Sequence, residues 1–271
     1  MNRIEKLRQS PHLSVSAIND YVECSLQYRF GRVDHLEPEY ISDALLFGTC
    51  IHRVLEGFHL AKKKREKIPL AYLIQQFENH WVRVNEENPH IQFKEGEDFK
   101  SLLQKGKELL TIYYRDLPQD SFRVLDTESS FSFELEGLEV PIVGVMDLVE
   151  EDEAGNIIIT DFKTSSHAYS KDEIDKSFQL TIYYMAARRN GFANREILLR
   201  FDCLIKTKTP KFQQYWTVRT EEDEKRAIRK IRSVWEGIQK GVYIPNDTSW
   251  KCGYCAFKNH CDQWFQEEEV V

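Results

Sequence analysis

The chain has 271 residues, of which 41% are hydrophobic and 30% are charged, and its formal net charge is −7. These values are typical of a globular protein with a sizeable core, and they exclude a protein coated with basic surface, although not a local basic channel. No apolar run is long enough to span a bilayer, and the N-terminal segment lacks the apolar centre of a secretory signal. We therefore expect a cytoplasmic protein without a membrane partner.

The first predicted element is a helix within residues 13–24, capped by Ser14 or Ser16 and ending near Cys24. Residues 44–59 predict an amphipathic helix that carries His52 and Glu56 on one face. His52 is either a metal ligand through its neutral imidazole or a hydrogen-bonded histidine at the edge of a helix.

Residues from about 70 to 117 also predict helices, with interruptions near 88–89 and 95–96. This stretch carries no pattern of chemical groups that indicates a site. We expect 60–120 to be a helical insertion that decorates the core of a single domain, 1–271.

From Arg123 the pattern changes to strands, first 124–133 and then two apolar runs on either side of an acidic turn within 141–163. The second feature predicts a β-hairpin centred on Ala154. Asp147 and Asp161 mirror each other about that centre, so their carboxylates are expected to stand opposite each other on the sheet. Lys163 follows Asp161 by two residues and projects to the same face.

Two facing carboxylates in an apolar sheet repel each other unless a cation lies between them. Their oxygen atoms suit Mg²⁺ or Mn²⁺, and Lys163 can orient a water or stabilise a phosphate beside the ion. The alternative is a surface hairpin with solvated charges. Phe162, between Asp161 and Lys163, is expected to point to the opposite face and to pack there.

A helix is predicted from about Asp172 to Asn190, with Gln179 and Tyr183 on one face. These two side chains can hydrogen-bond phosphates or Lys163; the alternative is that they form a partly buried polar pair. Strands 197–205 and 212–218 follow. The candidate nucleic-acid contacts are Lys206, Lys208, Lys211 and Tyr215, on these strands and the loop between them. The alternative is an exposed hairpin tip without a binding role.

The C-terminal segment contains Cys252, Cys255 and Cys261 within ten residues, which indicates a metal-binding loop. Zinc requires a fourth ligand, for which His260 and Cys24 are candidates, whereas an iron–sulfur cluster normally takes four thiolates. The two other cysteines lie in apolar patterns and are expected in the core; they are Cys50 and Cys203.

The order of these motifs is more specific than any one of them. A helix with His52 is followed by the segment 144–147, by Asp161-Phe-Lys163 and by Gln179-x-x-x-Tyr183. This order resembles the RecB-type branch of the PD-(D/E)XK nucleases. A lone cysteine upstream and C-x2-C-x5-C downstream are similar to the iron–sulfur subset of that branch, which includes the AddB nuclease domain and CRISPR-associated adaptation exonucleases.

The resemblance spans Cys24 to Cys261, although no proline precedes Asp147, as is usual in this branch. It implies a restriction-endonuclease-like α/β fold, with a central mixed β-sheet flanked by helices, an N-terminal helical region and a cysteine-rich tail, 242–271, that closes on Cys24. It also implies the site residues. The ligands of Mg²⁺ or Mn²⁺ are then His52, Asp147, Asp161 and the main-chain carbonyl of Phe162. The catalytic residues are the metal-binding Asp147 and Asp161 and the lysine Lys163, supported by Gln179 and Tyr183. A structural [4Fe-4S] cluster is held by Cys24, Cys252, Cys255 and Cys261.

The implied activity is that of a metal-dependent DNA nuclease, expected to be an exonuclease that hydrolyses phosphodiester bonds in DNA repair, recombination or phage- and CRISPR-related processing. Its partner is DNA, either single-stranded or at duplex ends. Because the helicase machinery that accompanies the RecB and AddB domains is absent here, the resemblance implies a nuclease that stands alone or is recruited by a helicase or another repair or adaptation protein. Two alternatives remain open: a non-catalytic nucleic-acid-binding scaffold with this fold, and a zinc-stapled hydrolase.

Overall fold

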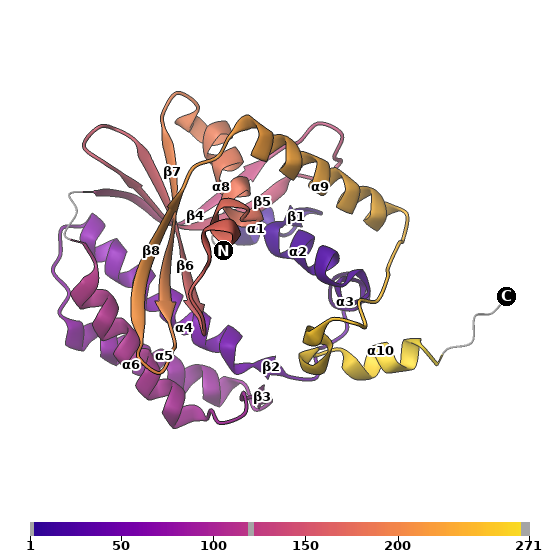
Figure 1. The fold of residues 1–271 in the computed structure, drawn as a ribbon, viewed down its shortest axis with the longest axis horizontal. Helices are drawn as coiled ribbons and strands as arrows, with labels where there is room; N and C mark the ends of the chain where they lie inside the picture. Colours follow the sequence, from indigo (N-terminus) through magenta and orange to yellow (C-terminus); the bar gives the residue numbers. More distant parts are fainter. Residues whose placement is uncertain (1–2, 119–121, 267–271) are drawn as a thin grey trace.

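The computed structural model describes residues 3–118 and 122–266, so residues 1–2, 119–121 and 267–271 of the expected domain, insertion and tail lie outside the described part. Its centre is a mixed sheet with the strand order β1–β5–β6–β7–β8, in which β4 also pairs with β5 (Figure 1). The strands are β1 (Leu13–Ser14), β4 (Arg123–Phe133), β5 (Ile142–Glu151), β6 (Ile157–Ser165), β7 (Ile197–Ile205) and β8 (Lys211–Thr217). A mixed sheet flanked by helices is thus confirmed.

Helices cover both faces of the sheet, and β2 (Ile41–Ser42) and β3 (Ile91–Gln92) form a separate parallel pair (Figure 1). The helices are α1 (Arg3–Leu7), α2 (Val15–Glu23), α3 (Ser25–Tyr28), α4 (Asp43–Lys63), α5 (Leu70–Glu87), α6 (Phe99–Asp116), α7 (Lys171–Asp175), α8 (Phe178–Ala187), α9 (Glu221–Gln239) and α10 (Lys258–Trp264). No helix in the described part of the chain combines the length and the apolar character needed to cross a bilayer.

Helices α4, α5 and α6 do more than decorate the core. Phe47, Phe77 and Trp81 on these helices are fully buried, and the cluster that they form includes Phe162 and Leu204 of the sheet. A second cluster lies on the other face of the sheet, beneath α2, α8 and α9. Within the expected helical insertion, 60–120, α5 and α6 pack with α4 against the sheet, because the apolar stripes of these helices must be covered and the sheet covers them.

The central hairpin has the predicted register. Leu148 pairs with Thr160 and Glu151 with Ile157, which puts the centre of the hairpin at Ala154. The turn is closed by the side chain of Asp152, which accepts hydrogen bonds from the main-chain and side-chain nitrogens of Asn156. The paired ladder ends at Leu148 and Thr160, one residue before each of the two aspartates, so β5 and β6 begin to separate where the candidate site lies.

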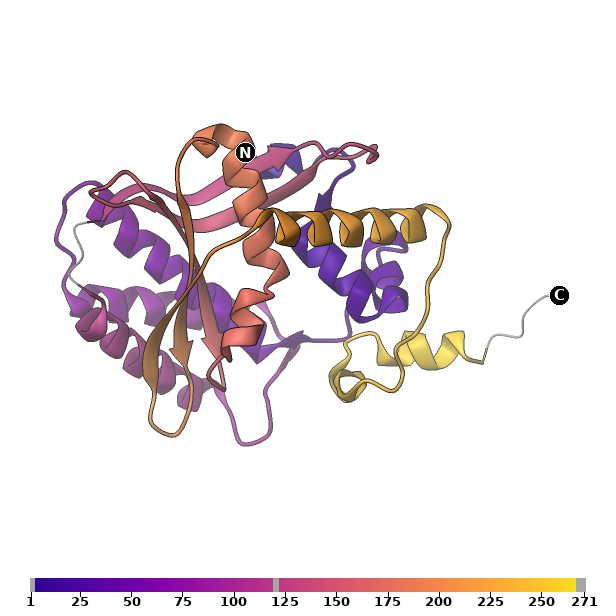
Figure 2. The ribbon, with the colours of Figure 1, turned by 45° about the horizontal axis from the view of Figure 1, so that its top comes forward.

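The helix expected over 172–190 is two helices. Helix α7 ends at Lys176, whose main-chain N–H donates to the carbonyls of Asp172 and Ile174. Ser177 then caps α8 by accepting a hydrogen bond from the Leu180 N–H. A serine hydroxyl competes with the helical hydrogen-bond pattern, which favours a new N-terminus at this point. The break directs α8 across the sheet in Figure 2 and carries Gln179 and Tyr183 towards β6.

The packing of α5 against α6 gives a test of the second core. A Cβ at Gly106 of α6 would overlap the ring of Phe77, whereas a Cβ at Gly57 of α4 would meet no atom within 4 Å. Gly106→Ala should lower the free energy of unfolding by about 1–3 kcal/mol through overpacking, whereas Gly57→Ala should raise it by up to about 1 kcal/mol. Urea denaturation followed by circular dichroism measures both, and equal stabilities of the two variants would contradict this packing.

Candidate metal centre and catalytic site

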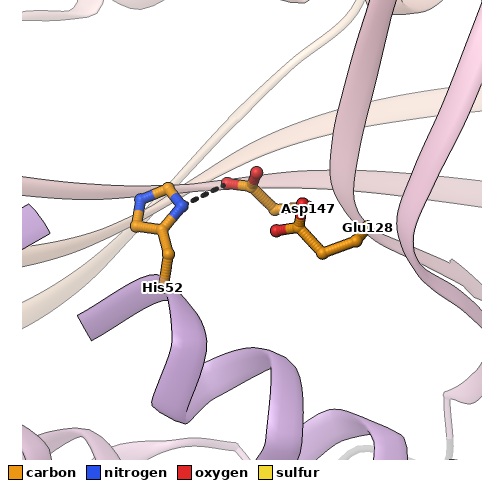
Figure 3. Close-up of side chains that lie close together, drawn as sticks. All are labelled: His52, Glu128 and Asp147. Atoms are coloured by element: carbon orange, nitrogen blue, oxygen red, sulfur yellow. Dashed lines mark ion pairs between the residues drawn. The ribbon is translucent and has the colours of Figure 1, made fainter. Parts of the chain in front are cut away.

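Three side chains from three different elements meet at the separation of β5 and β6. His52 of α4, Glu128 of β4 and Asp147 of β5 offer ligand atoms that all lie within 4.8 Å of one another (Figure 3). His52 Nδ1 lies 3.5 Å from Asp147 Oδ2. Among the described residues no other group of three or more histidine, cysteine, aspartate or glutamate side chains is as close. One imidazole and two carboxylates form a donor set that suits a divalent cation.

Glu128 is the member of this group to which the sequence analysis assigned no role. Thr127 pairs with Leu148 and Ser129 with Met146, so Glu128 lies opposite Asp147 on the neighbouring strand. Its backbone is in the left-handed region, with φ of 48°, which is a strained conformation for a glutamate. A sequence signal for it existed: a hairpin centred on the turn after Glu136 puts residue 128 opposite residue 147.

The charges at this group are not balanced by the protein alone. Desolvation, together with repulsion from Asp147 and Glu56, raises the pKa of Glu128 to about 7, although the residue as a whole is exposed to solvent. Burial lowers the pKa of His52, but its hydrogen bond with Asp147 and the charges of Asp147 and Asp161 outweigh burial and raise it. A bound cation would remove the repulsion between the carboxylates and compete with these protons.

Asp147 also completes the hydrogen bonding of the neighbouring strand. Its Oδ2 accepts the main-chain N–H of Phe162 at 2.7 Å, in the place of a carbonyl of a continuing β5 ladder. The ring of Phe162 points away from the carboxylates into the core beneath α4 and α6, as predicted. The bond holds the β6 segment that carries Asp161 and Lys163 against the strand that carries Asp147.

Asp161 lies in a second, adjoining network. Its Oδ2 is paired with Lys163 Nζ at 2.7 Å, and its Oδ1 accepts hydrogen bonds from Gln179 Nε2 at 2.7 Å and from the Tyr183 hydroxyl at 3.1 Å. Gln179 Oε1 in turn accepts from Lys163 Nζ at 2.7 Å. The structure thus brings together the acid, the lysine and both residues of the supporting helix motif.

The metal ligands expected from the sequence were His52, Asp147, Asp161 and the carbonyl of Phe162. The structure gathers His52 and Asp147 with Glu128 instead, while Asp161 faces Lys163. Asp161 nevertheless stays within electrostatic reach of the group: burial raises its pKa, Lys163 opposes that rise, and Asp147 adds to it.

Lys163 is held as a cation. Burial by itself lowers its pKa, but the ion pair with Asp161 and the charge of Asp147 raise it above the ordinary value. Its ammonium group also lies over the Phe201 ring, 5.2 Å from the centroid. An ammonium in this position can attract and orient an anion such as a phosphate.

An open cleft of about 780 Å³ leads to the group of His52, Glu128 and Asp147. It runs between α1 and the N-terminal half of α4, above β4 and β5, and its charged lining includes Arg8 and Arg53 as well as the acids. A substrate of the size of a nucleotide can reach the three ligand atoms through this cleft.

The four predicted cluster ligands line one small cavity that shares no lining residue with this cleft. Cys24, Cys252, Cys255 and Cys261 line a cavity of about 100 Å³ together with apolar side chains that include Phe30 and Phe257. Burial and the neighbouring thiols raise the pKa of Cys255 and of Cys261.

Asn246 is hydrogen-bonded to two of the cysteines at this cavity, and its bond to Cys24 joins the two ends of the chain. The Asn246 N–H donates to Cys24 Sγ at 3.4 Å, and Cys252 Sγ donates to the Asn246 carbonyl at 3.1 Å. The alternative ligand His260 packs near the rings of Phe30 and Phe257 and does not line the cavity. Cys50 and Cys203 are buried in the core, as predicted.

The candidate nucleic-acid contacts of the β7–β8 hairpin differ in their exposure to solvent. Lys206 is partly buried over the ring of Phe47, 4.5 Å from its centroid, and burial lowers its pKa. Lys208 and Lys211 are exposed, and Tyr215 is partly exposed on β8. Lys206 therefore does not share a surface with the other two lysines.

A family model described as the PD-(D/E)XK nuclease superfamily matches residues 12–262. The crystal structure of a putative exonuclease from Eubacterium rectale shares 14% sequence identity, covers 90% of this chain and 87% of its own, and superposes with a TM-score of 0.56, which is a likeness of fold. The crystal structure of SSO0001 shares 16% identity over 96% of each chain, with a TM-score of only 0.38. No curated protein sequence matches.

A divalent ion at this centre should stabilise the folded protein. Mn²⁺ or Mg²⁺ at about 100 times its Kd should raise the Tm by roughly 5–10 °C, because the ion binds only the folded chain. His52→Gln and Glu128→Gln should each lose most of that shift, whereas Glu66→Gln, an exposed carboxylate away from the cleft, should keep it. Thermal scans in chelator-treated buffer measure the shift, and a full shift in the His52 and Glu128 variants would contradict the centre.

Proposed function

We propose that this chain, which belongs to the PD-(D/E)XK nuclease superfamily, is a Mg²⁺- or Mn²⁺-dependent deoxyribonuclease that degrades DNA from its ends. The observation that carries the proposal is the contact between two groups: the candidate ligands His52, Glu128 and Asp147, and the Asp161–Lys163 pair beside them. A set of carboxylates next to a held ammonium group is suited to a phosphate whose charge must be offset before water can attack it.

The metal would be held by His52 and Asp147, with Glu128 or Asp161 and the main-chain carbonyl of Phe162 completing the set. The donor chemistry fits, since an imidazole and carboxylates with a raised pKa gain most from a cation. When bound, the ion supplies charge to the scissile phosphate and lowers the pKa of a water.

The chain's own groups orient the reaction. Lys163, kept protonated by Asp161, attracts the phosphate and holds the attacking water by hydrogen bonding rather than by taking its proton as a free amine. Gln179 bridges Lys163 and Asp161, and Tyr183 donates to Asp161, so both fix the direction of the carboxylate. The rate then depends on this positioning, and a change of any of these groups should affect turnover more than DNA binding.

We further propose that Cys24, Cys252, Cys255 and Cys261 hold a structural [4Fe-4S] cluster that fastens the two ends of the domain, as in the iron–sulfur subset of RecB-type nucleases. The shared cavity and the hydrogen bond to Cys24 Sγ support a common group. Four thiolates are the usual ligand set of an iron–sulfur cluster, and a zinc site held by the same four cysteines is the alternative.

The proposed exonuclease acts together with other proteins of the cell. The resemblance to the RecB-type branch implies a helicase or an adaptation protein as the partner that opens or delivers the DNA end. The exonuclease assignment draws on the description of the Eubacterium rectale protein, which shares the fold. A scaffold without activity would have no chemical need for the Lys163–Gln179–Asp161 arrangement.

Cleavage of end-labelled single- and double-stranded DNA under anaerobic conditions tests the activity. The unmodified protein should cleave with Mg²⁺ or Mn²⁺ and be inert in EDTA, while Asp161→Ala and Lys163→Ala should lower the rate at least about 100-fold with the fold intact. Tyr72→Ala, an exposed aromatic on α5, serves as the control and should leave the rate unchanged. Clean Asp161 or Lys163 variants that still cleave DNA at the normal rate would reject the assignment.

Metal analysis of anaerobically purified protein tests the cluster. We expect brown protein with iron and sulfide, and loss of both together with lower solubility in Cys252→Ala. Cys50→Ala is the matched control, since Cys50 is buried in the core away from the cavity and should leave the iron content unchanged. Colourless protein that contains zinc in place of iron would show that the staple is a zinc site.

A further inference from the structure

The face of the sheet that carries Asp161 and Lys163 continues across β7 to the edge strand β8. We propose that this continuation is a binding strip for single-stranded DNA, in which unpaired bases stack on Tyr169 and Tyr215 and the backbone passes Lys211. This inference rests on the proposed nuclease function and adds to it a substrate class, a single strand rather than a duplex, and the residues that select it.

The strand register defines the strip. Asp161 pairs with Phe201 and Phe201 with Tyr215, while Lys163 pairs with Cys203 and Cys203 with Gln213. Side chains in cross-strand register project to the same face of a sheet. Tyr215 and Gln213 are thus on the face of Lys163, two strands away, which is a separation of about 10 Å.

Aromatic rings connect the catalytic lysine to the edge of the sheet. Lys163 Nζ lies over Phe201, and the Tyr169 ring is 5.7 Å from the Phe201 ring and 6.3 Å from that of Tyr215 (centroid distances). Phe201 is buried and forms the floor, whereas Tyr169 and Tyr215 are partly exposed. His167, which is exposed, lies 6.0 Å beyond Tyr169. Partly exposed rings next to a phosphate-attracting ammonium group are the arrangement on which successive unpaired bases stack.

The charges along the strip suit a nucleic-acid strand. Lys211 pairs with Ile205 at the far end of β8 and is exposed on the same face, and the exposed Gln213 lies between it and Tyr215. The nearby Glu173 stays negatively charged, and its carboxylate accepts hydrogen bonds from the N–H and hydroxyl of Ser170 in the N-terminal cap of α7. Positive charge therefore stands at both ends of the strip, from Lys163 to Lys211.

The opposite face of β8 provides a control. Trp216 follows Tyr215 and is also exposed, but its ring packs on Arg200, 4.8 Å from the centroid, on the face covered by α4–α6. Both neighbours are aromatic and reach solvent, but they lie on opposite faces of β8. A contact that depends on the proposed strip requires Tyr215 and not Trp216.

The test compares two fluorescent DNA strands of equal length and charge, one with a mixed sequence and one in which all bases are absent. Binding is measured by fluorescence anisotropy with the full chain and Ca²⁺, and a gel confirms that the DNA stays intact. Tyr169→Ala and Tyr215→Ala should each weaken binding of the base-containing strand at least five-fold, or about 1 kcal/mol, and of the abasic strand less than two-fold. Lys211→Ala should weaken both equally, because it contacts the backbone.

Tyr215→Phe keeps the ring and should bind like the unmodified protein, as should Trp216→Ala. If Tyr169→Ala does not fold, Tyr215→Ala decides alone, since Tyr215 lies on the edge strand. Unchanged binding in the tyrosine variants, equal losses for both DNAs, or no binding of the base-containing strand at all would overturn the strip. The predicted binding pattern in a protein that does not cleave DNA with Mg²⁺ or Mn²⁺ would instead reject the nuclease function and leave the strip standing.

Discussion

The hydrogen bond from the Phe162 N–H to the Asp147 carboxylate is the interaction on which the site depends. It replaces a bond of the β-ladder at the point where β5 and β6 separate, and it fixes one carboxylate at the opening between them. His52 meets Asp147 at this opening, and the β4–β5 ladder places Glu128 opposite Asp147. The arrangement leaves buried like charges close together, which costs free energy until a cation binds.

Alternate residues of β6 serve two different parts of the molecule. Phe162 packs among His59 and Tyr113 in the core under α4 and α6, and those two side chains are themselves hydrogen-bonded at 2.7 Å. Its neighbours Asp161 and Lys163 project to the other face, into the network with α8. The core formed by α4–α6 thus anchors the strand that carries the chemistry, which explains why a long helical stretch without catalytic motifs belongs to the body of the domain.

The hairpin could be predicted because period-two alternation and a central turn determine which residues face each other, and Ala154 is its centre in the structure as well. The same reasoning applied to the preceding turn would have found Glu128, but its left-handed backbone has no signal in a single sequence. The break at Ser177 was not predicted, because the helical periodicity continues through it and the side-chain cap that starts α8 is a local feature. Lys206 illustrates a further limit, since charge does not reveal that tertiary packing places a lysine over Phe47.

The central claim is that His52 and Asp147 share one divalent cation beside Lys163. The most direct measurement is an anomalous-difference map from crystals grown with Mn²⁺, recorded at the manganese absorption edge. The account predicts a peak within coordination distance of His52 and Asp147, with Glu128 or Asp161 as a further ligand. A fully occupied Mn²⁺ elsewhere in the crystal, with none between His52 and Asp147, would contradict it.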